Sequence, residues 1–240
     1  MLLNNGELVK AAQIAETDLA LKSYLKNIVN KPIYGFRNEV SEISQIFGIL
    51  GVSSSQQTVH NYMVSLLSPS KWVLFKLNSN SFHELQAQLS RKWKTILAHL
   101  EINDIDIESS ITLLPASIIV TEALFSDKKA DVELLRATSD IDFNTILKRL
   151  CGLDLFDVCE KIGKKWEMSD TVIKIVQAAS GEKPSEDSIV NNLGKWMHLL
   201  LFYELSQPTF IEAGLNDFIS FNVDYVEDIY NDFATLMEIE

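Results

Sequence analysis

Apolar residues recur at three- and four-residue steps along almost the whole 240-residue chain. The clearest stretch lies near the end and has one apolar side, formed by Val226, Ile229, Tyr230, Phe233, Leu236 and Met237. Asp228 and Asp232 fall on the opposite face, as in an amphipathic helix. We expect Asp224 and Glu227 to start this helix, because both carboxylates can accept free amide hydrogens of the first turn. The periodicity predicts an all-α fold.

Two earlier segments support the same fold class. Ser169 stands before a helical pattern that should end at Gly181 and has its apolar residues at Val172, Ile175, Val176 and Ala179. Ser185 or Asp187 should start the next helix, which we expect to be central because its apolar arc is wide: Ile189, Val190, Leu193, Met197, Leu200 and Leu201. Residues 72–75 form the one strand-like run, but they are too few to distinguish a strand from buried helix.

Composition indicates a folded protein with a substantial core, since 47% of the residues are hydrophobic and 22% are charged. The N-terminus lacks the cationic start and long apolar segment of a secretory signal. The longest apolar run, residues 111–125, is shorter than the roughly 20 residues that a membrane span needs. Cys151 and Cys159 are expected to be reduced, buried residues. We therefore expect a soluble, cytoplasmic protein that does not contact a membrane.

Net negative charge is concentrated at the C-terminal end of the chain. Residues 196–240 contain nine of the 33 acidic residues and no Lys or Arg, within a chain of net charge −12. Such a field repels phosphate, so no nucleic-acid partner is expected. The basic stretches 91–94 and 161–166 are interpreted as solvated faces of amphipathic helices.

The same acidic segment is rich in aromatic residues. It contains nine of the 22 aromatics, namely Trp196, Phe202, Tyr203, Phe210, Phe218, Phe221, Tyr225, Tyr230 and Phe233. Most of them should be core residues. If a few are exposed beside the acids, they would form an aromatic patch with an acidic rim, suited to a basic partner surface.

Residues 14–51 carry the most specific motif of the chain. Asp18, with Ala20 and Leu21, is followed by a turn that contains Asn30, Pro32, Tyr34 and Gly35, and then by a helix expected to end near Gly51. These residues resemble the HDOD domain, whose corresponding motifs are Asp-Pro-Ala-Leu and Asn-Ser-x-x-Tyr-Gly. A second, weaker match is residues 150–159 followed by 165–168, where the family has Leu-Gly-x-Asp-His and Trp-Gly-Leu-Pro.

The resemblance implies an HD-domain-like bundle of many helices with an N-terminal helical subdomain. We expect a single domain over residues 1–240, divided into a unit up to about residue 85 and a second unit from about 86 that includes the acidic C-terminal helix. HDOD domains are output domains of bacterial signalling proteins and are thought to act through protein contacts. The resemblance thus implies a regulatory domain with protein partners and leaves self-association open. Asn30 and Tyr34 are expected to pack the turn, with the tyrosine hydroxyl as an anchor.

Enzymatic relatives of the family are phosphohydrolases that bind metal through His and Asp side chains. The resemblance places these ligand positions at Thr95 or Lys94, Pro115, Ala116, Leu155, Ala178, Ala179 and Leu201. None of these side chains is a suitable ligand for a divalent metal ion. The sequence therefore predicts no catalytic residue, no metal and no cofactor.

Two alternatives stay open. The first is a phosphohydrolase with a displaced metal site drawn from His99, Glu101, Asp104 or His198. The second is a sensor that binds a cyclic dinucleotide, without cleaving it, in the pocket left by the lost metal site. The four histidines, His60, His83, His99 and His198, show no metal-ligand spacing and are interpreted as structural or surface residues. Asp104 is expected to cap a helix.

Overall fold

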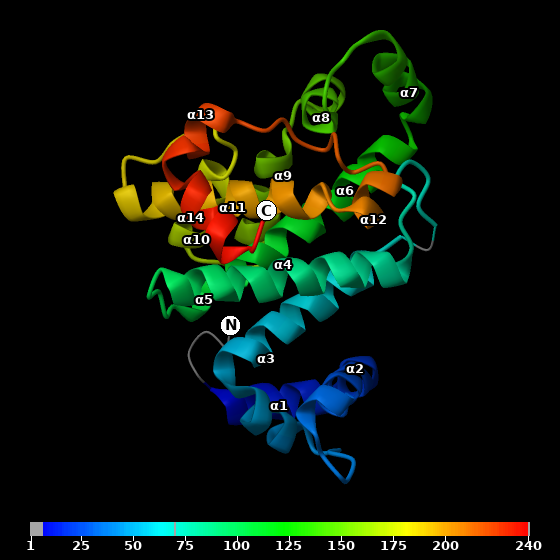
Figure 1. The fold of residues 1–240 in the computed structure, drawn as a ribbon. Helices are drawn as coiled ribbons and strands as arrows, with labels where there is room; N and C mark the ends of the chain where they lie inside the picture. The colour runs from blue at the N-terminus through cyan, green and yellow to red at the C-terminus, as the bar shows by residue number, and fades with distance from the viewer. Residues whose placement is uncertain (1–6, 70, 240) are drawn as a thin grey trace. The chain divides into compact units, whose positions relative to one another are not determined.

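The computed structural model describes residues 7–69 and 71–239, and every regular element among them is a helix (Figure 1). The all-α prediction is therefore confirmed. The chain divides into two compact units. The first unit is Met1–Leu66 with Asp104–Ser109, and the second is Leu67–Asn103 with Ser110–Glu240. The residues around 67–85 thus group with the larger second unit.

The first unit contains α1 (Leu8–Thr17), α2 (Leu19–Val29), a 3-10 turn η1 (Pro32–Tyr34), most of α3 (Ile43–Leu67) and α5 (Ile105–Ser109). Its core is formed by Ala11, Ala12, Ala15, Leu25, Val29, Val40, Ile43, Ile46 and Phe47. Asp18 caps α2, because its Oδ1 accepts the amide hydrogens of Ala20 at 2.9 Å and Leu21 at 3.0 Å. Asp104 caps α5 in the same way, as predicted.

Helix α3 is kinked at Gly51. This residue has φ 72° and ψ 177°, a conformation that glycine adopts readily and other residues rarely do. The helix predicted to end near Gly51 does stop there, and a second helical segment follows immediately. Gly51 therefore sets the direction of the chain beyond the N-terminal motif.

The second unit contains the remaining helices. They are α4 (Ser79–His99), η2 (Ser110–Thr112), α6 (Leu113–Ser126), α7 (Lys129–Thr138), α8 (Phe143–Cys151), α9 (Leu155–Lys165), α10 (Asp170–Ala178), α11 (Ser188–Leu205), α12 (Pro208–Glu212), α13 (Val223–Val226), η3 (Glu227–Ile229) and α14 (Tyr230–Leu236). Helix α10 packs on both α9 and α11, and α9 also packs on α6. Ser169 caps α10 as predicted, and of the two caps predicted for α11, Ser185 and Asp187, it is Asp187 that caps the helix. The predicted apolar arc of α11 is buried except for Ile189.

Residues 72–75 form a loop, and one buried carboxylate holds it. Glu122 of α6 is fully buried and accepts the backbone N–H groups of Val73, Leu74 and Phe75. Phe75 then packs edge-on against Phe143, with ring centroids 5.2 Å apart. The run is neither a strand nor a helix, and within it Phe75 is buried while Val73 is exposed.

The C-terminal helix starts differently from the prediction. Asn222 has an extended backbone, and its Oδ1 accepts the amide hydrogen of Tyr225 at 3.2 Å, so Asn222 is the cap and the prediction for Asp224 is wrong. The periodic segment is also divided into α13, η3 and α14. Its apolar face is nevertheless largely kept, because Val226, Ile229 and Phe233 are buried.

One stretch of the described chain, Ile105–Ser126, is long and apolar enough to cross a membrane. However, 78% of its most apolar window is buried inside the protein, which is typical of a core helix. The expected cytoplasmic location stays a prediction.

Candidate functional site

The turn that follows α2 is held closed by the side chain of Asn30. Its Nδ2 donates to the carbonyl oxygens of Lys26 and Val40, both at 2.9 Å, and its Oδ1 accepts the N–H of Val40 at 2.8 Å. Within the turn, Gly35 ends η1 in the left-handed region with φ 65°. These bonds fix both ends of a short surface loop, residues 31–39, which we call the 31–39 loop.

The 31–39 loop exposes its apolar side chains. Ile33 is 87% exposed, Phe36 is 46% exposed and Tyr34 is 38% exposed. The rings of Tyr34 and Phe36 lie nearly parallel, with centroids 6.4 Å apart. The anchoring role expected for the Tyr34 hydroxyl is wrong, since this hydroxyl has no hydrogen-bond partner among the described residues. The loop therefore combines an ordered backbone with an apolar surface flanked by Lys31 and Arg37.

Most of the positions to which the resemblance assigns the metal ligands of enzymatic relatives lie in the hydrophobic core of the second unit. These buried positions are Pro115, Ala116, Leu155, Ala178, Ala179 and Leu201. They belong to α6, α9, α10 and α11 or to the end of α10. Thr95 differs, because it is exposed on α4 and its Oγ1 donates to the carbonyl of Arg91. The buried residue near it is Trp93.

Close packing fills this part of the core. A β-carbon on Gly194 of α11 would lie only 2.6 Å from the β-carbon of Ala178 on α10, so α10 and α11 are in direct contact there. Helices α9 and α6 are also in direct contact. The thiol of Cys159 on α9 donates to the carbonyl oxygen of Leu113 on α6, at 3.5 Å. Burial raises the pKa of Cys159 to about 12, so the thiol is protonated and unreactive at neutral pH. Cys151 is also a free thiol and lies on α8, but it is only partly buried, so the burial expected for it is wrong.

His198, the histidine beside the former ligand positions, is bonded through both ring nitrogens. Its Nδ1 lies 2.8 Å from the carbonyl oxygen of Ala179, and its Nε2 accepts the N–H of Asn222 at 3.2 Å. The ring is therefore neutral, with the proton on Nδ1. Burial lowers the pKa of His198, although the bond to Ala179 opposes this shift. Both nitrogens serve the backbone, which leaves no free lone pair for a metal ion.

Two other residues of the proposed displaced site, His99 and Asp104, also have structural contacts. The ring of His99 packs at 5.6 Å from that of Trp196, and the carboxylate of Asp104 caps α5. Among residues 7–69 and 71–239, no three His, Cys, Asp or Glu side chains are grouped so that they could hold a metal ion. The prediction that the protein is not an enzyme stays a prediction.

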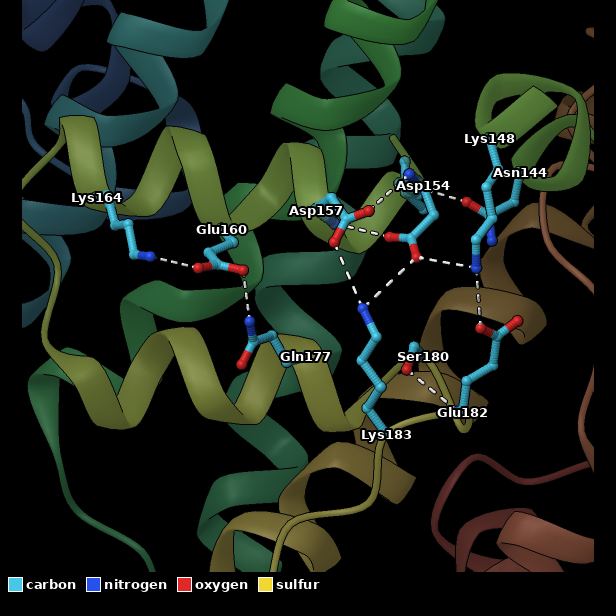
Figure 2. A network of polar contacts seen from close by, with 11 residues as sticks. Asn144, Lys148, Asp154, Asp157, Glu160, Lys164, Gln177, Ser180, Glu182 and Lys183 are labelled. Atoms are coloured by element: carbon cyan, nitrogen blue, oxygen red, sulfur yellow. Dashed lines mark hydrogen bonds and ion pairs between the residues drawn. The ribbon is translucent and has the colours of Figure 1, made fainter. Parts of the chain in front are cut away.

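A polar network at the start of α9 was not predicted (Figure 2). Asp154 and Asp157 form a capping box, in which each carboxylate accepts the amide hydrogen of the other residue, at 2.7 and 3.0 Å. Lys148 and Lys183 approach the buried Asp154 carboxylate at 3.8 and 3.9 Å. Burial raises the pKa of Asp157, but hydrogen bonds from Asp154 and Lys183 and the positive charge of Lys183 outweigh this and lower it overall. The three-residue spacing of the two aspartates could have predicted the cap.

This network explains the second family match. Asp154 and Leu155 stand where the family has Asp-His. The aspartate caps α9, while the amide hydrogen of Leu155 is bonded to the Asn144 side chain at 2.6 Å. The Leu155 side chain is fully buried. The local backbone thus has a stable helix start, and the position of the former ligand is part of the core.

Comparison with known proteins identifies the class to which this all-helical fold belongs. A family model, described as the HDOD domain, matches residues 4–181. The chain therefore belongs to the HDOD domain family. No curated protein matches the sequence.

One solved structure shares the fold. It is the crystal structure of an HDOD domain protein with unknown function from Geobacter sulfurreducens, which superposes with a TM-score of 0.62. The match covers 99% of this chain and 87% of the other, at 14% sequence identity. At this identity, the similarity shows the fold alone.

Proposed function

We propose that this HDOD protein is a non-catalytic domain of bacterial signal transduction that acts by contacting a partner protein. The observation that carries the proposal is the 31–39 loop, where Asn30 fixes the backbone while Ile33 and Phe36 stay exposed. An ordered loop with exposed apolar side chains loses little conformational freedom when a partner covers it. Full burial of a side chain such as Ile33 contributes about 1.5–3 kcal/mol.

The loop also has features that favour a particular partner surface. The rings of Tyr34 and Phe36 lie nearly parallel with centroids 6.4 Å apart, so they offer a preformed aromatic face. Lys31 and Arg37 flank the apolar residues. A partner with an apolar pocket and an acidic rim would match this pattern in shape and charge.

The former ligand positions support a function without catalysis. Metal-assisted hydrolysis needs imidazole and carboxylate groups that hold a metal ion and activate its water. Pro115, Ala116 and Leu155 are buried and have no such groups. His198 is engaged by the backbone on both sides.

Photo-crosslinking from the loop tests the interaction. A benzophenone amino acid placed at position 33 of the full chain should give a discrete adduct in a lysate of the producing cells. The adduct should weaken when Asn30 is replaced by alanine, because the loop loses the bonds that order it. The matched control carries the benzophenone at Val9, which is also exposed. The same adducts from both positions, or none from position 33, would contradict the proposal.

Metal content tests the enzymatic alternative independently. The purified protein is dialysed against manganese, iron and zinc separately and analysed by mass spectrometry. Less than about a tenth of an equivalent of each metal is expected. One or two tightly held equivalents would show that our assignment of the ligand positions is wrong. Calorimetric titration with cyclic dinucleotides tests the sensor alternative in the same way, and no heat of binding is expected.

A further inference from the structure

A groove on the second unit is formed by the segment that contains α13, η3 and α14. It has a volume of about 430 Å³ and is lined by Phe221, Val223, Val226, Glu227, Tyr230 and Asn231. Four of these six side chains are apolar or aromatic, and Glu227 is the charged one. The volume is within the range of sites that bind organic groups.

The groove contains two of the exposed apolar or aromatic side chains of the C-terminal segment. We expected most of the nine aromatic residues of this segment in the core, but only four of them are buried: Trp196, Phe210, Phe218 and Phe233. Tyr230, in contrast, is 47% exposed and Val223 is 59% exposed. The two side chains line the same groove, so they form a continuous apolar surface that a ligand can reach.

The charge around this groove is negative. Glu227 lines it, and the exposed Asp224 follows Val223 directly in the sequence. Residues 196–240 contain no Lys or Arg. Lys195, the last basic residue of the chain, is already paired with Asp228, at 2.7 and 2.6 Å from its two carboxylate oxygens. No basic side chain of the C-terminal segment itself therefore compensates Glu227 and Asp224.

We infer that this groove binds a partner segment in which an apolar side chain is flanked by lysine or arginine. The inference rests on the proposed function, since it assumes that the domain acts through protein contacts. The apolar residue would enter between Val223 and Tyr230, and its basic neighbours would face Glu227 and Asp224. The apolar contact provides affinity, while the charges select the partner and raise its rate of association. The 31–39 loop carries Lys31 and Arg37 against Glu39 and is net positive, so the two surfaces favour partners of different charge.

Selection from a displayed library of random peptides of about 12 residues tests the inference and does not require the natural partner to be identified first. The full chain is the bait. Enriched peptides should contain an apolar residue with Lys or Arg on both sides. Binding of the best peptide should weaken as salt is raised, because exposed charges are screened.

Matched variants locate the binding surface. Glu227→Lys with Val223→Ser should weaken the best peptide by at least about tenfold. Glu212→Lys changes the same charge at an exposed position of α12 and should leave binding unchanged. Glu227→Lys alone serves if the double variant is not folded by circular dichroism. No enrichment of such basic peptides, or equal binding of the best one to the variants, would overturn the inference.

The peptide experiment and the crosslinking experiment can fail independently of each other. Crosslinking from position 33 reports on the 31–39 loop and should be unaffected by Glu227→Lys. Loss of peptide binding with normal crosslinking would support the groove as a separate site. Failure of the peptide selection with normal crosslinking would overturn the groove alone.

Discussion

Two loops of this protein are each held by one polar side chain, yet one loop buries its phenylalanine and the other exposes it. Asn30 holds the 31–39 loop, and Glu122 holds residues 73–75. Phe75 is buried, whereas Ile33 and Phe36 are exposed. The comparison teaches that a polar side chain can fix a loop backbone without deciding its role. The direction of the apolar side chains separates a core loop from a contact surface.

Removal of the aromatic side chain from each loop should give the largest difference. Phe75→Ala should destabilise the second unit by about 3–5 kcal/mol, because Phe75 packs against both Phe143 and Phe218. Phe36→Ala should change stability by less than about 0.5 kcal/mol. Urea unfolding followed by circular dichroism measures both. Similar losses in the two variants would contradict the distinction between the loops.

Deletion of the buried carboxylate should have the next largest effect. Glu122→Ala leaves three backbone N–H groups without their acceptor and should cost about 2–3 kcal/mol. Glu122→Gln keeps one acceptor oxygen and should cost less. Hydrogen exchange at Val73, Leu74 and Phe75 should accelerate in the alanine variant. The exposed Glu84 on α4 provides the control, and an equal effect of Glu84→Ala would refute this role of Glu122.

Asn30→Ala should weaken the first unit by about 1–2 kcal/mol, because Asn30 is only partly buried and water can replace some of its bonds. The Val40 amide, which donates to Asn30, should exchange faster with solvent. Asn27→Ala removes an exposed amide from the same helix and serves as control. Unchanged exchange at Val40 would mean that the loop does not depend on Asn30.

His198 is a third side chain that joins two backbone segments, and it differs because it titrates. Burial lowers its pKa, so the folded state binds fewer protons than the unfolded state as the pH falls below about 6.5. Its contribution is present above that pH and is lost on acidification. Stability from urea unfolding should therefore fall between pH 7 and 5, and His198→Gln should reduce this dependence. An identical pH dependence in the variant would contradict the assignment.

Local sequence patterns predicted the parts of the fold that depend on near neighbours. Ser169 and Asp187 start their helices as expected, because a cap bonds amides two or three residues away. The loop at residues 72–75 was not predicted, because the carboxylate that holds it is 47 to 49 residues distant. The start of the C-terminal helix was assigned to Asp224, since Asp224 and Asn222 are both good caps and only the backbone conformation distinguishes them.

In the candidate site, too, only the features that depend on near neighbours in the sequence could be predicted. The residues of the turn from Asn30 to Gly35 were visible in the sequence, and the bond from Asn30 to Val40, ten residues later, was not. Exposure of Tyr34 and Phe36 was also hidden, because aromatic residues near a tight turn are equally compatible with core packing. Accessibility depends on what the rest of the chain covers, and local patterns do not contain that information.

Ile33→Ser should have the smallest effect on stability, and it is the variant that tells most about function. Ile33 is 87% exposed, so its loss should change the free energy of unfolding by less than about 0.5 kcal/mol. With a benzophenone at position 36, the yield of the partner adduct should nevertheless fall severalfold, because the partner loses an apolar contact. Leu19→Ser is the matched control, since Leu19 is 80% exposed at the start of α2, outside the loop. Equal adduct yields in the two variants would show that apolar exposure at the 31–39 loop has no special role. A stability loss confined to Ile33→Ser would instead make the loop part of the core, and the difference between the two loops would disappear.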